Sequence, residues 1–78
     1  MVDSKTNQAL DLFKSGKMTK ALSLFKTFKI GFSNEEQRTV QIAYEALTGK
    51  ATFYEGLGIN TAQTIEEATA LIKTKYNL

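Results

Sequence analysis

Apolar residues recur along the chain at the spacing of amphipathic helices, and short stretches containing glycine separate the recurrences. The clearest pattern follows the i, i+3, i+4, i+7 order that places side chains on one helical face: Met18, Ala21, Leu22, Phe25 and Phe28. Four of the five glycines, at positions 16, 31, 49 and 58, fall where such a pattern ends. Because glycine adopts the left-handed cap conformation without a Cβ clash, the pattern predicts consecutive short helices.

The apolar spacing also gives approximate bounds for these helices. We expect helices over about 4–15, 18–30 and 33–48, a shorter one carrying Phe53 and ending at Gly58, and a last one over about 64–76. The first two have only Gly16 and Lys17 between them and should therefore form an antiparallel hairpin. Apolar residues occupy two sides of the helix over 33–48, which predicts that this helix is the central element.

Two helix starts carry the sequence signature of a capping box, in which each side chain hydrogen-bonds an unpaired backbone N–H of the first turn. The first pair is Ser33 with Glu36, and the second is Thr64 with Glu67. Strict apolar–polar alternation and hairpin turn sequences are missing, so strands are not indicated. The predicted fold is an all-α, compact bundle of four to five short helices in one domain over 1–78.

The hydrophobic faces together define a candidate core. Its members are Leu10, Phe13, Leu22, Phe25, Phe28, Val40, Ala43, Tyr44, Leu47, Phe53, Leu57, Ile65, Ala68 and Ile72. A chain of 78 residues buries only about 60–65% of the surface that its unfolded form exposes, so most of its apolar residues should serve one core.

The composition limits the catalytic and metal-binding chemistry that the chain can perform. The chain has no histidine, cysteine, proline or tryptophan, and so lacks the usual general base, a thiolate and the commonest transition-metal ligands. The acidic pairs Glu35-Glu36 and Glu66-Glu67 fall in predicted first helical turns, where the helix dipole favours negative charge. Glu45 is the one acid that we expect in an unusual environment. These observations predict a protein that is not an enzyme and uses no cofactor or metal.

The same residues bear on location. No apolar run approaches the ~18–20 residues that cross a bilayer, and the N-terminus lacks a secretory pattern. We therefore expect a cytoplasmic protein that does not span a membrane.

Charge is unevenly distributed about a net value of +2. Residues 1–32 hold six lysines against two aspartates, a balance of +4, whereas residues 33–78 hold four cations against six glutamates, a balance of −2. Clustered cations bind phosphate backbones, so nucleic-acid binding is the alternative function, with candidate residues Lys14, Lys17, Lys20, Lys26 and Lys29. The single arginine, Arg38, weighs against base-specific recognition.

Aromatic residues exceed what one small core requires. The chain has five phenylalanines and three tyrosines, and the surplus predicts a surface for a partner. The candidate partner-binding residues are Phe32, Phe53, Tyr54 and Ile59. The other interpretation is that Phe32 and Ile59 hold their loops on the core. Our leading hypothesis is a non-catalytic protein-binding module, and the same surface would allow self-association.

Two resemblances accompany this reading. Over about residues 5–33 the first hairpin resembles a single tetratricopeptide motif, in the spacing of Ala9, Gly16, Ala21 and Phe25. No array is indicated, because Lys50 and Glu55 occupy positions where a second repeat needs small residues.

A longer resemblance is to small uncharacterised helical proteins of phages and prophages. It is carried by the run from Phe25 to Thr39 and by Ile42–Glu45, Gly49, Phe53-Tyr54 and Leu57-Gly58. This resemblance implies a mobile-element accessory factor or an inhibitor of a host protein, and it assigns a role to no residue.

Overall fold

Five α-helices form the described part of the chain, residues 4–28 and 31–78, in the computed structural model. They are α1 (Lys5–Lys14), α2 (Met18–Phe25), α3 (Asn34–Glu45), α4 (Ala51–Gly56) and α5 (Thr61–Tyr76). A kinked turn, η1 (Ala46–Lys50), joins α3 to α4. No strand occurs within these ranges, so the predicted all-α helical bundle is confirmed.

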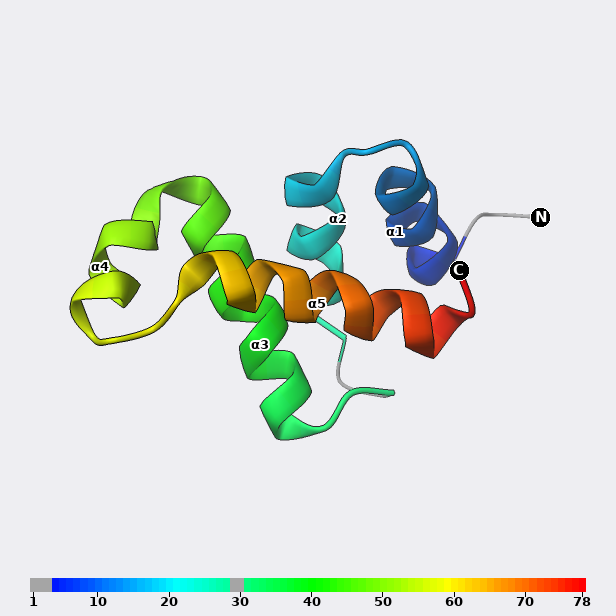
Figure 1. Ribbon diagram of the computed structural model, residues 1–78. Helices are drawn as coiled ribbons and strands as arrows, with labels where there is room; N and C mark the ends of the chain where they lie inside the picture. Colours follow the sequence, from blue (N-terminus) through cyan, green and yellow to red (C-terminus); the bar gives the residue numbers. More distant parts are fainter. Residues whose placement is uncertain (1–3, 29–30) are drawn as a thin grey trace.

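The helices are arranged around α3 and α5, which pack on one another (Figure 1). Helices α1 and α2 form the expected antiparallel hairpin, and α2 lies against α3. Helix α4 stands at the opposite end from the hairpin and packs mainly beside the η1 turn and the start of α5. The molecule therefore has a hairpin end, a central α3–α5 pair and an α4 end.

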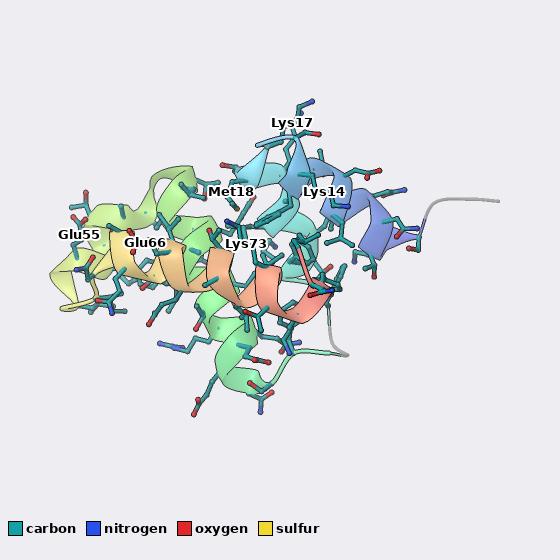
Figure 2. The ribbon with its side chains drawn as sticks, turned by 45° about the vertical axis from the view of Figure 1, so that its right-hand side comes forward. Lys14, Lys17, Met18, Glu55, Glu66 and Lys73 are labelled. Carbon is teal, nitrogen blue, oxygen red and sulfur yellow. The ribbon has the colours of Figure 1, made fainter. Side chains whose placement is uncertain are left out.

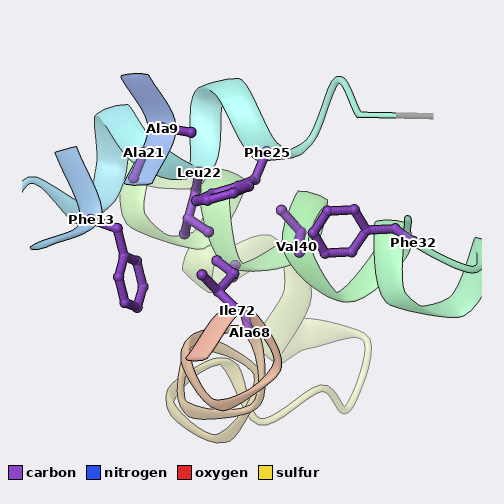
Figure 3. Close-up of a cluster of buried hydrophobic side chains, with 10 residues drawn as sticks. Ala9, Phe13, Ala21, Leu22, Phe25, Phe32, Val40, Ala68 and Ile72 are labelled. Atoms are coloured by element: carbon purple, nitrogen blue, oxygen red, sulfur yellow. The ribbon is translucent and has the colours of Figure 1, made fainter. Parts of the chain in front are cut away.

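The turn between α1 and α2 begins with a helix C-cap at Gly16. The Gly16 N–H donates to the Phe13 carbonyl (3.2 Å) and the Lys17 N–H to the Leu12 carbonyl (2.9 Å). These two bonds form a Schellman motif, which requires a left-handed residue, and Gly16 supplies it with a φ of 80°. Ala9 and Ala21, both fully buried, let the two helices approach closely (Figure 3).

Helix α2 ends at Phe25 and not near Ile30, so its predicted end was wrong. Lys26 and Thr27 form a turn, and the Phe28 N–H donates to the Phe25 carbonyl (3.0 Å). The side-chain amide of Gln37 donates to the Phe28 carbonyl and connects this turn to α3. By leaving the helix here, the chain brings both Phe28 and Phe32 against the ring of Phe25.

The core combines side chains from all helices except α4 (Figure 3). Its buried members are Ala9, Phe13, Ala21, Leu22, Phe25, Phe32, Val40, Ala43, Ala68 and Ile72. Predicted core residues Leu10, Phe28, Tyr44 and Ile65 pack against this group while partly exposed. The expectation that α3 is apolar on two sides is also met, because Ile42 and Ala43 are both buried.

Aromatic rings close one side of the core. The Phe25 ring centroid lies 5.3 Å from that of Phe28, 6.3 Å from Phe32 and 5.6 Å from Tyr76. Lys75 Nζ lies 5.2 Å from the Phe32 ring centroid and 3.0 Å from a carboxylate oxygen of Glu36. This cluster connects α2, the segment before α3, and the end of α5.

Of the two predicted capping boxes, the structure confirms the one at the start of α3, and the one predicted for the last helix was wrong. At α3 the Glu36 N–H donates to Ser33 Oγ (3.2 Å) and the Ser33 N–H to Glu36 Oε1 (2.8 Å), as predicted. Helix α5 begins at Thr61, because Asn60 Oδ1 accepts from the Gln63 N–H (3.0 Å). Thr64 is instead a buried residue inside the helix. Asparagine is as favourable an N-cap residue as serine, and α5 begins at this earlier candidate cap.

Two glycine substitutions separate conformational strain from steric contact. Gly49 has a φ of 113°, whereas Gly56 has no positive φ and lies inside α4. A Cβ added at either position would meet no atom within 4 Å. We expect Gly49→Ala to lower the free energy of unfolding by ~1–2 kcal/mol and Gly56→Ala to raise it by up to ~1 kcal/mol. Urea denaturation measures both, and effects of the same sign would contradict the backbone assignment.

Candidate functional site: an exposed apolar surface on α4

Helix α4 has no buried residue among its six. A helix of this length lies far below the ~12–15 residues at which isolated helices begin to hold together in water. Its start is set by the η1 turn and its end by Gly58, whose N–H donates to the Glu55 carbonyl (3.0 Å) in a second Schellman motif. Contacts outside the helix must therefore hold α4 in place.

Side-chain hydrogen bonds provide these contacts. The Tyr54 hydroxyl donates to the carboxylate of Glu45 on α3, and Gln41 Nε2 donates to the other carboxylate oxygen (3.2 Å). At the far end of α4, the Thr61 hydroxyl donates to Glu55 Oε2 (3.1 Å). Helix α4 is thus attached to α3 and α5 by polar contacts, while its own apolar side chains remain available.

The hydrogen bonds at Glu45 shift the pKa values of both Glu45 and Tyr54. The hydrogen bond from Tyr54, followed by that from Gln41, holds the pKa of the Glu45 carboxyl below its ordinary value. The same bond to Glu45 raises the pKa of the Tyr54 hydroxyl. The predicted unusual environment of Glu45 is therefore a structural connection between α3 and α4.

The lowered pKa of Glu45 predicts a loss of stability in acid. A carboxyl whose pKa is lower in the folded chain stabilises the fold above its ordinary pKa of 4.5, and this contribution disappears as the pH falls through the folded value. We expect the free energy of unfolding to fall below about pH 4.5, and the deficit of Glu45→Gln relative to the natural protein to shrink there. Urea denaturation between pH 3 and 7, spanning roughly the carboxyl range, measures this; parallel curves for both proteins would contradict it.

Three large apolar side chains of this region are exposed, and we call them the α4 surface: Leu47, Phe53 and Leu57. Their exposed fractions are 39%, 62% and 63%. Phe53 lies in α4, Leu57 is its C-cap residue, and Leu47 precedes the helix in η1. All three were predicted to be core residues, and the exposed fractions show that this was wrong. The kink at Thr48 and Gly49 directs the following helix away from the core.

The candidate partner-binding residues are divided between surface and interior. Phe53 is exposed, and its neighbour Tyr54 is half-buried with the two ring centroids 5.2 Å apart. Ile59 is half-buried directly after the α4 end. Phe32 is 8% exposed and lies in the aromatic cluster, which agrees with the interpretation that it holds its loop on the core. Leu57 and Leu47 are the surface residues that sequence reasoning missed.

The candidate lysines occupy several places. Lys17 and Lys20 line an open depression of about 360 Å³ together with Gly16, Met18 and Thr19. Lys14 stands in the last turn of α1, on the same side of the molecule as Lys17 (Figure 2). Lys26 Nζ lies 5.1 Å from the ring centroid of Tyr44, so its ammonium group packs against the bundle. Lys29 lies outside the described residues.

The charges of the two ends differ in sign. Residues 4–28 contain five lysines and one aspartate. Residues 51–72 contain three glutamates, Glu55, Glu66 and Glu67, and no lysine or arginine. Glu55 and Glu66 lie at the α4 end, away from Lys14 and Lys17 (Figure 2). Lys50, the N-cap residue of α4, is the one cation near these glutamates, so residues 45–67 hold four glutamates against one lysine and the depression has lysines beside it.

Two further tests of the described residues concern metals and membranes. Residues 4–28 and 31–78 contain no group of three acidic side chains placed to hold a metal ion. In the same ranges, no helix has the length and apolar character that crossing a membrane requires.

Comparison of the chain with protein-family models, curated proteins and solved structures found no match.

Proposed function

We propose that the protein is a non-catalytic binding module that docks on another protein through the α4 surface. The observation that carries the proposal is the occurrence of exposed apolar side chains along one segment, residues 47–57, which runs from η1 through α4 to its C-cap. Among the described residues, four large apolar side chains are markedly exposed, and Leu47, Phe53 and Leu57 account for three of them. Single exposed apolar residues are common on soluble proteins, whereas a group on one short segment is typical of an interaction site.

The construction of α4 supports the same function. A segment that served only to connect α3 to α5 has no need of Phe53 and Leu57, because neither side chain contributes a buried group to the core. An exposed phenylalanine on a short helix held by polar contacts, Phe53, resembles the anchors that an amphipathic helix inserts into a partner. The resemblance to small phage and prophage proteins supports an accessory factor or an inhibitor of a host protein as the setting of this activity.

Site-specific photo-cross-linking tests the proposal. A photoreactive amino acid replaces Phe53, Leu57 or, as the control, Leu78, which is 45% exposed at the chain end. Irradiation of cells that produce each protein is expected to give a discrete covalent adduct with a protein from positions 53 and 57 and not from position 78. Adducts of equal yield from all three positions, or none from positions 53 and 57, would exclude the α4 surface as the docking site.

Nucleic-acid binding is the second candidate function, supported by the position of Lys17 and Lys20 in one open depression, with Lys14 on the same side. Each phosphate contact releases counterions, so binding through these lysines must weaken steeply with salt. Gel shifts with duplex DNA and single-stranded RNA at about 50 and 200 mM salt decide the question. This candidate requires binding at low salt that Lys17→Glu/Lys20→Glu abolishes; absence of binding at low salt eliminates it.

A further inference from the structure

We infer that the α4 surface of one copy binds the lysine-lined depression of a second copy, so that the chain associates head to tail. The inference rests on the proposed function, because it takes the α4 surface to be a docking surface, and it identifies one partner for it. The two regions are separate: α4 lies at one end of the molecule, and the α1–α2 turn with Lys17 lies along its side, nearer the middle (Figures 1 and 2). A copy that uses one of them therefore keeps the other free.

Shape is the first argument. Helix α4 stands at one end of the bundle (Figure 1), where Phe53 and the following Leu57 are exposed, and Gly16 to Lys20 line an open depression at the start of α2. The depression is shallow and open to solvent, and Met18 in its lining offers a flexible apolar contact for an aromatic ring.

Charge is the second argument. Lys17 and Lys20 line the depression, and Glu55 and Glu66 lie at the α4 end. In the head-to-tail arrangement the lysines of the depression face an end of the molecule that carries more glutamates than lysines. Electrostatic complementarity of this kind selects the partner and the orientation. The small net charge of +2 also leaves little overall repulsion between copies.

The contact area available to this association is small. Stable interfaces bury about 800 Å² on each partner, while the whole described surface has an area of 5156 Å². Three exposed side chains and one depression supply less than such an interface, so the contact is weak and requires high concentration. Because the two contacting regions differ, the contact does not close on itself and each added copy can bind another.

Complementary variants provide the experiment. Phe53→Ser/Leu57→Ser removes the apolar contact, and Lys17→Glu/Lys20→Glu reverses the charge of the depression. Both pairs lie on the surface, and glutamate in the first turn of α2 favours the helix, so both proteins are expected to fold. Leu78→Ser is the matched control, since it removes an exposed leucine away from both regions. Sedimentation equilibrium is measured from about 10 μM to 1 mM, a range suited to weak interfaces.

The expected result is specific to head-to-tail contact. The natural protein and Leu78→Ser should gain mass continuously with concentration, and less so when salt is raised from about 50 to 500 mM, which screens the charge pairs. Each double variant alone should stay monomeric, with at least about tenfold weaker association, as expected for loss of a central anchor. An equimolar mixture of the two should form a heterodimer and stop there, because each supplies the intact region that the other lacks.

Two outcomes would overturn the inference. A natural protein that stays monomeric throughout the concentration range excludes self-association, and a mixture of the two double variants that stays monomeric excludes the pairing of these regions. Photo-cross-linking from position 53 to a different protein would then still support the α4 surface as a docking site. Loss of that cross-link as well would remove the proposed function itself, so the two failures are distinguishable.

Discussion

Replacing Phe25 with alanine is expected to leave the protein largely unfolded or to lower its melting temperature by more than about 12 °C. Phe25 is 1% exposed and its ring contacts those of Phe28, Phe32 and Tyr76. Truncating a buried phenylalanine costs about 3–5 kcal/mol, and a chain of this length has a total stability of ~4–12 kcal/mol. Each kcal/mol corresponds to ~4–8 °C in a domain of this size.

The matched control for this substitution is Phe53→Ala. The chemical change is the same, but Phe53 is 62% exposed on α4, so we expect a change in unfolding free energy of no more than about 0.5 kcal/mol. Thermal unfolding followed by circular dichroism at the helical band compares the two variants directly. Equal losses at both positions would mean that Phe53 belongs to the core and would contradict the placement of α4.

Ile72→Ala is expected to have the second largest effect, a loss of ~2–5 kcal/mol in the free energy of unfolding. Ile72 is completely buried and lies on α5, which packs on α3. Its truncation leaves a cavity beside Val40 and Leu22 in the centre of the core (Figure 3). The conservative change Ile72→Val removes one methylene and should lose only ~0.5–1.5 kcal/mol.

Urea denaturation of both Ile72 variants provides the measurement. The ratio between the two losses matters more than either value, because a buried site responds in proportion to the volume removed. A loss of less than about 1 kcal/mol for Ile72→Ala would show that α5 does not close the core at this point.

The regular part of the fold was predictable because local signals agreed with one another. The glycines at 16, 31, 49 and 58, chosen from the sequence as helix ends, are the ones with positive φ. The capping box of Ser33 and Glu36 set the start of α3, and the apolar stripes located Leu22, Phe25 and Ile72 in the core. In each case a few neighbouring residues determine the conformation.

The predicted helix ends were wrong where two local signals compete or where tertiary contacts determine the conformation. Asn60 and Thr64 both can cap a helix, and nothing in the sequence alone gave Asn60 priority. The stripe of α2 continues to Phe28, yet the helix ends at Phe25, and the ring of Phe28 packs against that of Phe25 from the turn that follows. Sequence periodicity reports which residues share a face and not where the chain leaves the helix.

The candidate site was only half predictable for a related reason. The sequence identified Phe53 and Tyr54 as a pair that one surface cannot bury equally, and the structure exposes the first and bonds the second to Glu45. Leu57 and Leu47 were assigned to the core because their spacing fits an apolar face. Leu57 follows the kink at Thr48 and Gly49 and Leu47 directly precedes it, so the regular helical spacing that suggested one face does not extend across both positions.

Quantitative affinity purification with natural protein, Phe53→Ser/Leu57→Ser and Leu78→Ser tests the central claim, that α4 provides a surface for a partner, most directly. All three proteins should be folded, because none of the altered residues is buried. We predict a protein whose recovery falls at least about tenfold with the double variant and is unchanged with Leu78→Ser, as expected for loss of interface anchors. Equal recovery of every captured protein by all three baits would contradict the claim.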